Sequence, residues 1–130
     1  MTKATTDARD YLPLSAQVFQ VLLSLADGPQ HGYAIIVDVG ERTSGEMTLT
    51  ASTLYDALAR LVDQELIEET DAPSPTAVAG RAGAAPPKGD ARRRYYGLTS
   101  LGRDVAEAEA RRLERLLAMA RDKRLLKGRR

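Results

Sequence analysis

Residues 50–70 read TASTLYDALARLVDQELIEET, and this stretch predicts a helix followed directly by a strand. Thr50 suits the N-cap position, because its hydroxyl can accept the backbone N–H of Thr53. Four apolar side chains then recur at helical spacing over about residues 51–64: Leu54, Leu58, Leu61 and Val62. Residues 66–70 favour a strand.

Two further helices are expected before this stretch. Apolar residues at helical spacing predict a largely buried helix from about residue 14 to residue 26, and Asp27-Gly28-Pro29 ends it. A second helix is expected from about residue 31 or 32 to residue 41, and Thr43-Ser44-Gly45 breaks it. Residues 46–49 favour a short strand.

The chain beyond residue 70 predicts a loop, a strand and a long helix. Residues 72–91 contain four Pro, three Gly and seven Ala, so we expect a mobile loop. Residues 92–98 predict a strand that pairs with residues 66–70. Thr99 is expected to cap a final helix over about residues 100–124.

Three helices, a β-hairpin and a long last helix are the element order of a winged helix-turn-helix. The fold class is therefore mainly α (α+β), with a two-stranded wing and a long C-terminal helix. In such modules the helix after the turn enters the DNA major groove and the hairpin reaches the flanking backbone. The expected division is a flexible arm (1–11), a DNA-binding domain (12–98) that contains the mobile wing loop (72–91), a C-terminal dimerisation helix (99–126) and a basic tail (127–130).

Composition removes several classes of protein. The 130 residues contain no Cys and one His, which excludes disulfides and cysteine-ligated metals. No apolar run approaches the roughly 20 residues that span a bilayer, and the N-terminus lacks a signal-peptide core. No catalytic motif is present, so we expect a cytoplasmic binding protein with no cofactor, no metal and no catalytic residues.

Charge is distributed unevenly along the chain. Residues 27–71 have ten acidic and two basic side chains, whereas residues 72–130 have fifteen basic and six acidic ones. A basic half can attract phosphate through counterion release. Solvated helix faces would produce the same pattern, so charge alone leaves both interpretations open.

Four ordered segments resemble elements of the PadR-type transcriptional regulators. They are LADGPQHGY (25–33), TLYDALARL (53–61), ELIE (65–68) and RYYGLTSLG (94–102). The resemblance covers about residues 14–105 and implies the short subfamily, in which one C-terminal helix mediates dimerisation. The chain departs from the family pattern at Ser52 and Glu65, which stand where Gly is usual, and in its long wing loop.

Candidate DNA-binding residues fall into three groups. The first lies at the start of the second helix, the second in the first turn of the third helix, and the third in the wing. In that order they are His31 and Tyr33; Thr50, Ser52, Thr53 and Tyr55; Lys88, Arg92, Arg93 and Arg94.

Helix N-termini, short hydroxyls and Arg or Lys side chains all suit phosphate, and hydroxyls can also reach base edges. Each group has a structural alternative: Tyr33 can pack between helices, Thr50 can be only a cap, and the wing cations can be solvated. His31 has no Cys or second His to complete a metal site.

The last helix has an apolar stripe that needs a partner. We expect it to be covered partly by its own domain and partly by a second copy of the chain. The dimerisation residues are expected to be Leu101, Val105, Leu113, Leu116, Leu117 and Ala120. A two-fold dimer would place two recognition helices about one DNA turn apart on a pseudo-palindromic operator.

The expected function is that of a PadR-like DNA-binding transcriptional regulator, a nucleoid-associated repressor that binds double-stranded DNA as a homodimer. A winged-helix protein–protein interaction module without specific DNA binding is the alternative, and the acidic middle segment favours it. An enzyme is a third and weaker reading. Regulators of this kind usually respond to a signal, which leaves a small-molecule effector open, although the sequence identifies none.

Overall fold

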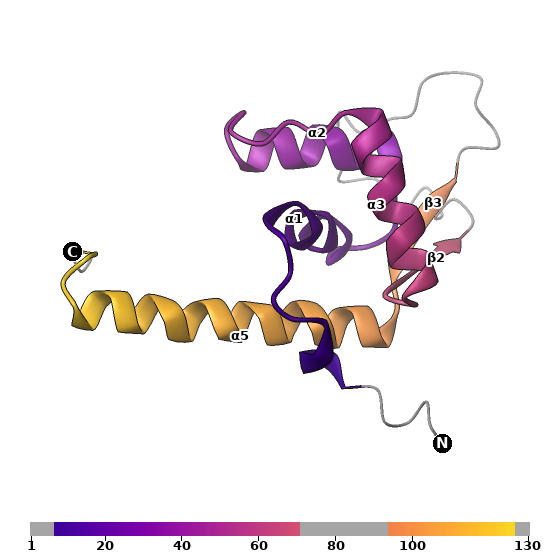
Figure 1. The fold of residues 1–130 in the computed structure, drawn as a ribbon. Helices are drawn as coiled ribbons and strands as arrows, with labels where there is room; N and C mark the ends of the chain where they lie inside the picture. The colour runs from indigo at the N-terminus through magenta and orange to yellow at the C-terminus, as the bar shows by residue number, and fades with distance from the viewer. Residues whose placement is uncertain (1–6, 71–93, 127–130) are drawn as a thin grey trace.

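The computed structural model describes residues 7–70 and 94–126. The chain is mainly helical with one small sheet, as predicted, and its last helix is the longest element (Figure 1). The elements in order are η2 (Ala8–Tyr11), α1 (Ala16–Leu25), β1 (Gln30–His31), α2 (Gly32–Arg42), α3 (Ala51–Asp63), β2 (Ile67–Thr70), β3 (Tyr95–Leu98) and α5 (Ser100–Asp122). The predicted wing loop (72–91) lies outside the described residues.

Side-chain caps decide where the helices begin. The Thr50 hydroxyl accepts the backbone N–H of Thr53 at 3.1 Å, as the sequence predicted for α3. The Thr99 hydroxyl accepts the N–H of Gly102 at 2.9 Å and starts α5, which confirms the second predicted cap. Ser15 caps α1 in the same way. Each cap of this kind stabilises its helix by about 1 kcal/mol.

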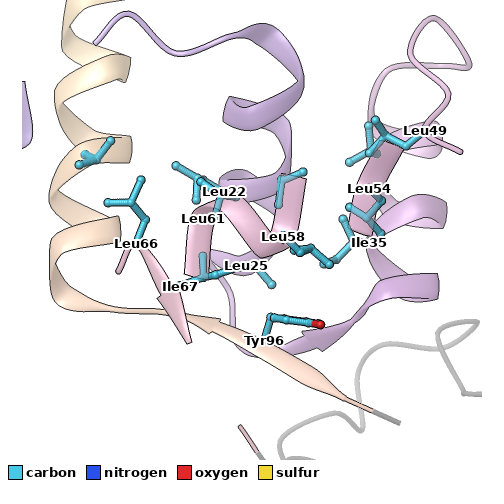
Figure 2. Close-up of a cluster of buried hydrophobic side chains, with 13 residues drawn as sticks. Leu22, Leu25, Ile35, Leu49, Leu54, Leu58, Leu61, Leu66, Ile67 and Tyr96 are labelled. Carbon is cyan, nitrogen blue, oxygen red and sulfur yellow. The ribbon is translucent and has the colours of Figure 1, made fainter. Parts of the chain in front are cut away.

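The core lies between α1, α2, α3 and the sheet. Figure 2 shows leucine and isoleucine side chains from these elements pointing toward one another, with Tyr96 of β3 at the edge. The predicted buried face of α3 is confirmed for Leu54, Leu58 and Leu61, which are fully buried, whereas Val62 is half-buried. The other members of the cluster are Val21, Leu22, Leu25, Ile35, Val39, Leu49, Leu66, Ile67, Tyr96 and Val105.

The sheet has three antiparallel strands in the order β1-β3-β2. The predicted hairpin is present: Ile67 pairs with Leu98, and Thr70 pairs with Tyr95. The sheet also contains a strand that the sequence did not predict, β1, whose residue Gln30 pairs with Tyr96 on the other side of β3. A two-residue strand has no periodicity of its own, so only its pairing with β3 defines it.

The strand expected over residues 46–49 is not formed. Instead, the Met47 N–H donates to the Thr43 hydroxyl at 3.0 Å, and that hydroxyl donates to the Val39 carbonyl at 2.9 Å. The end of α2 therefore holds this segment as a turn. Its apolar residue Leu49 is buried in the core all the same.

The expected flexible arm over residues 1–11 is wrong for its last part. Ala8–Tyr11 form the 3₁₀ helix η2, and Asp7 caps it by accepting the Arg9 N–H at 2.9 Å. This helix packs on α5, and Ala8 and Tyr11 contact the core cluster. Residues 1–6 lie outside the described part of the chain. The helix η2 forms because α5 offers a surface against which it can pack.

Arg42 fastens α2 to α1. Its guanidinium donates to the side-chain and backbone oxygens of Gln20, both at 2.9 Å, and to the Ser24 hydroxyl at 2.9 Å. It also pairs with Asp38 one turn earlier in α2, at 2.7 Å. The orientation of α2, which carries part of the candidate site, is therefore set by hydrogen bonds as well as by packing.

An ion pair between Glu109 and Arg112 lies near the middle of α5, at the last buried position of this helix. The Glu109 side chain is 2% exposed, and its two oxygens accept from Arg112 Nε and Nη2 at 2.7 and 2.8 Å. These hydrogen bonds, together with one from the backbone of Leu14, lower the pKa of the Glu109 carboxyl, although burial opposes them. Glu109 therefore joins the segment before α1 to α5.

Substituting Glu109 by Gln is expected to lower the free energy of unfolding by about 1 kcal/mol at pH 7, because a buried charge-assisted hydrogen bond is lost. A carboxyl whose pKa falls on folding stabilises the fold above its unfolded pKa of about 4.3. That stabilisation disappears as the pH falls through the folded pKa. Urea unfolding of both proteins from pH 7 to pH 3 should therefore give curves that converge in acid.

The matched control for this substitution is Glu107→Gln, on an exposed position of the same helix. It should follow the wild type at every pH. A constant offset between Glu109→Gln and the wild type down to pH 3 would contradict an ionic origin of the stabilisation.

Candidate nucleic-acid interface

The N-terminal end of α3 presents hydroxyl groups to solvent. Thr50 and Ser52 are exposed, and Thr53 is half-buried. The Thr50 hydroxyl lies 3.0 Å from the Thr53 hydroxyl, so the cap and the first turn share one hydrogen-bonded arrangement. The positive end of the helix dipole adds to this surface, which makes it suitable for phosphate or for the edge of a base.

Tyr55 brings α3 against the start of α2. A Cβ atom added to Gly32 would lie 2.7 Å from Tyr55 Cζ and nearer still to its hydroxyl. The tyrosine ring therefore rests on the backbone of Gly32, where a larger residue has no room. Its remaining surface faces solvent, since the side chain is 46% exposed.

Tyr33 and His31 have different environments, although the sequence grouped them. Tyr33 is 48% exposed, and its ring stacks on the ring of His31 with centroids 6.4 Å apart. His31 is 2% exposed, and Tyr95 meets its ring edge-on at 5.3 Å. Its Nδ1 atom accepts the backbone N–H of Ala34 at 3.1 Å and so caps α2.

The sequence placed His31 among the DNA-binding candidates, but its buried ring is not placed to donate to DNA from both nitrogens. An Nδ1 atom that accepts a hydrogen bond cannot also donate one, and the ring is covered by protein. The physical reason is local, since the residue at the start of α2 must satisfy an N–H group of the first turn. Tyr33 is the residue of this pair that reaches solvent.

The described part of the wing contributes one of its predicted cations. Arg94 is exposed, and its Nη1 atom lies 3.4 Å from Glu69 Oε2 on the neighbouring strand. Burial raises the pKa of Tyr96, and a hydrogen bond from Arg94 opposes that rise. The other candidates of the wing, Lys88, Arg92 and Arg93, lie outside the described residues.

Four acidic side chains lie away from the N-terminal end of α3. Asp63 and Glu65 follow at its C-terminal end, and Glu68 and Glu69 lie on β2, all of them exposed. A polyanion would be repelled there. The face suited to DNA is therefore limited to the first turn of α3, the two exposed tyrosines and the guanidinium of Arg94.

The dimerisation candidates separate into two sets along α5. Val105 is fully buried and Leu101 half-buried in the core of their own chain, so they are not available to a partner in the way the sequence suggested. Figure 1 shows the C-terminal half of α5 extending past α1. Leu113, Leu116 and Leu117 of that half are exposed, and Ala120 is half-buried.

Two residues of the site were not found from the sequence. Gly32 matters because Tyr55 packs on it, and a glycine as the first residue of a helix, where no cap requires one, was the available signal. Tyr95 supports the His31 ring from β3. Nothing local distinguished Tyr95 from its neighbour, since their faces are assigned only by the strand register.

A family model describes most of this architecture. The model of the transcriptional regulator PadR-like family matches residues 21–108, which include the second half of α1, the elements from β1 to β3 and the start of α5. The chain belongs to the PadR-like family. The members of this family are transcriptional regulators, not enzymes. Nothing in the described part of the chain forms a helix of the length and apolarity that crossing a membrane requires.

A longer curated protein also matches most of this chain. An uncharacterised 37.1 kDa protein in transposon Tn4556 of Streptomyces fradiae is 38% identical over 96 residues. The match covers 74% of this chain but 22% of that protein. This chain therefore spans less than a quarter of the length of that relative.

Solved structures of similar fold come from several bacteria. A PadR-like transcriptional regulator from Bacillus cereus superposes with a TM-score of 0.62 at 18% identity and covers 87% of this chain and 93% of its own. A transcriptional regulator from Clostridium thermocellum gives 0.59 at 22% identity, with 92% and 96% covered. Bacillus subtilis PadR in complex with operator DNA gives 0.55 at 20% identity, with 74% and 47% covered. At these identities the likeness shows the fold.

Proposed function

We propose that this PadR-family regulator is a homodimeric, nucleoid-associated repressor that binds a pseudo-palindromic operator. The observation that carries the proposal is the exposed N-terminal end of α3, with Tyr33 and Tyr55 half-exposed beside it. A Bacillus subtilis PadR of the same fold has been solved with operator DNA, which supports DNA as the partner of this chain. Repression then follows from occupying promoter DNA.

Each group of residues has a separate role in this proposal. Thr50, Ser52 and Thr53 enter the major groove at the start of α3 and contact phosphate or base edges. Tyr33 and Tyr55 contact the backbone on the side of α2. The wing contacts the flanking backbone through Lys88, Arg92, Arg93 and Arg94.

The pair between Arg94 and Glu69 does not prevent this role. At 3.4 Å between two exposed side chains, such a pair contributes little free energy. A phosphate can therefore replace the Glu69 carboxylate as the partner of Arg94. Glu69 limits the affinity of the wing without abolishing it.

The test is a titration of the protein into labelled DNA from its own upstream region, with a random duplex as control, at two salt concentrations. Arg94→Ala should weaken binding to both duplexes and reduce the slope of log K against log salt by about 2, because each subunit of the dimer loses one phosphate contact. Ser52→Ala should reduce the preference for the specific duplex by about tenfold, if its hydroxyl reads a base edge. Thermal unfolding of both variants checks that they remain folded.

The outcomes separate two functions. Tight, salt-sensitive binding that favours the upstream DNA supports the repressor. No binding to either duplex at low salt would move the conclusion to a winged-helix module that binds protein, which the exposed acids Asp63, Glu65, Glu68 and Glu69 favour. If Ser52→Ala lowers the affinity for both duplexes equally, Ser52 contacts phosphate only.

A further inference from the structure

The end of α3 and the start of α5 share one hydrogen-bonded joint. Glu65 adopts a left-handed conformation (φ 66°), and the Leu66 N–H donates back to the Leu61 carbonyl at 3.0 Å. The Thr99 hydroxyl lies 2.7 Å from the Glu65 carbonyl and 3.0 Å from the Leu66 carbonyl. The Thr99 N–H also donates to Leu66, at 3.1 Å. The N-cap residue of α5 is thus bound to the turn that ends α3.

Gly102 lets α5 lie directly on this turn. A Cβ atom at position 102 would lie 2.9 Å from the Leu66 carbonyl carbon and closer still to its oxygen. The first turn of α5 therefore contacts the backbone of the α3–β2 turn with no side chain between them. Contacts between backbones leave less freedom of rotation than contacts between long side chains.

A second attachment lies one residue further along α5. The Arg103 Nη2 atom donates to the carbonyl of Ala26, the C-cap residue of α1, at 2.9 Å. The first four residues of α5 are therefore fastened both to the end of α3 and to the end of α1. Two separate attachments fix the direction of α5 relative to α3 and α1, whereas a single attachment would let the helix rotate about that point.

We propose that this joint, formed by Thr99, Gly102 and Arg103 with Glu65, Leu66 and Ala26, determines the half-site spacing that the dimer accepts. The inference rests on the proposed function, in which α5 joins two copies. The exposed apolar face is centred near Leu116, about 24 Å along α5 from Ser100 at about 1.5 Å per residue. A rotation of about 10° at the joint would move that face by about 4 Å, more than the rise of about 3.4 Å per base pair.

The experiment first selects the preferred site of the wild type from duplexes with a randomised centre, and then inserts or deletes one base pair between the half-sites. The wild type should lose about tenfold in affinity on either change. Thr99→Val keeps the shape of the side chain without its hydroxyl, and Arg103→Ala removes only the second attachment. We expect the affinity of both variants to fall by less than about threefold when one base pair is inserted or deleted.

The matched control is Ser15→Ala, which removes the cap of α1 and leaves the joint intact. Ser15→Ala should discriminate between half-site spacings as the wild type does, although it should lose about as much stability as the variants of the joint. Sedimentation measures whether each protein remains dimeric, and Arg103→Ala alone decides the result if Thr99→Val fails to fold.

The two ideas fail in different ways. Variants that keep the tenfold discrimination, or a wild type that tolerates the inserted base pair, would overturn the role of the joint while the repressor stands. A wild type that is monomeric, or that enriches no paired half-sites, overturns the proposed function and the role of the joint together.

Discussion

Replacing Leu116 by Glu is expected to convert the protein to monomers and to weaken binding to a two-half-site operator by at least about a hundredfold. The loss is this large because a dimer binds its second half-site without a further loss of translational freedom. Leu116 is 46% exposed, although it lies in line with the buried residues Val105 and Glu109 on α5. A carboxylate at that position would have to be buried in the interface without a partner.

The control for this prediction is Ala118→Glu. Position 118 is exposed and lies about 200° around the helix from position 116, so the same charge is added on the opposite side of α5. Sedimentation should give a monomer for Leu116→Glu and the wild-type mass for Ala118→Glu. A dimer that survives Leu116→Glu with unchanged affinity would place the interface elsewhere.

Substituting Gly102 by Ala is expected to lower the free energy of unfolding by about 3 kcal/mol, which is large for the addition of one methyl group. The added Cβ would overlap the Leu66 carbonyl, which is backbone and cannot rotate away as a side chain would. Either α5 must move off the α3–β2 turn or the turn must open. Both changes disrupt the hydrogen bonds of Thr99.

Gly40→Ala provides the matched comparison, because Gly40 lies inside α2 with nothing within 4 Å of an added Cβ. There the substitution should stabilise the protein by about 0.5–1 kcal/mol, since Ala loses less conformational entropy than Gly in a helix. Urea unfolding measures both variants. Equal effects at the two positions would mean that the contact of Gly102 with Leu66 relaxes readily.

Most of the secondary structure follows from local signals in the sequence. The stop at Asp27-Gly28-Pro29, the caps at Thr50 and Thr99, and the apolar spacing of α3 depend on neighbours within about one turn of helix. Such features predicted α2, α3, β2 and α5 closely. The same signals, together with the four motifs, identified the family that the match over residues 21–108 shows.

The candidate site was predicted less completely, because exposure depends on what other segments cover. His31 and Tyr33 are two residues apart at the start of α2, yet one is buried beneath Tyr95 and the other is half-exposed. The apolar stripe of α5 looked continuous, but Val105 belongs to the core of its own chain and Leu116 does not. Periodicity identifies an apolar face without saying how far along the helix it is covered.

The sequence by itself determined the order of the four α-helices and the hairpin, the caps that start α3 and α5, the buried face of α3 and the membership of the PadR-like family. Only the tertiary structure decided that β1 joins the sheet, that Gly32 is covered by Tyr55, and that α5 is fastened to the end of α3. The reason is the separation of the partners along the chain. Thr99 lies 34 residues from Glu65, and Arg103 lies 77 residues from Ala26, so no local pattern connects them.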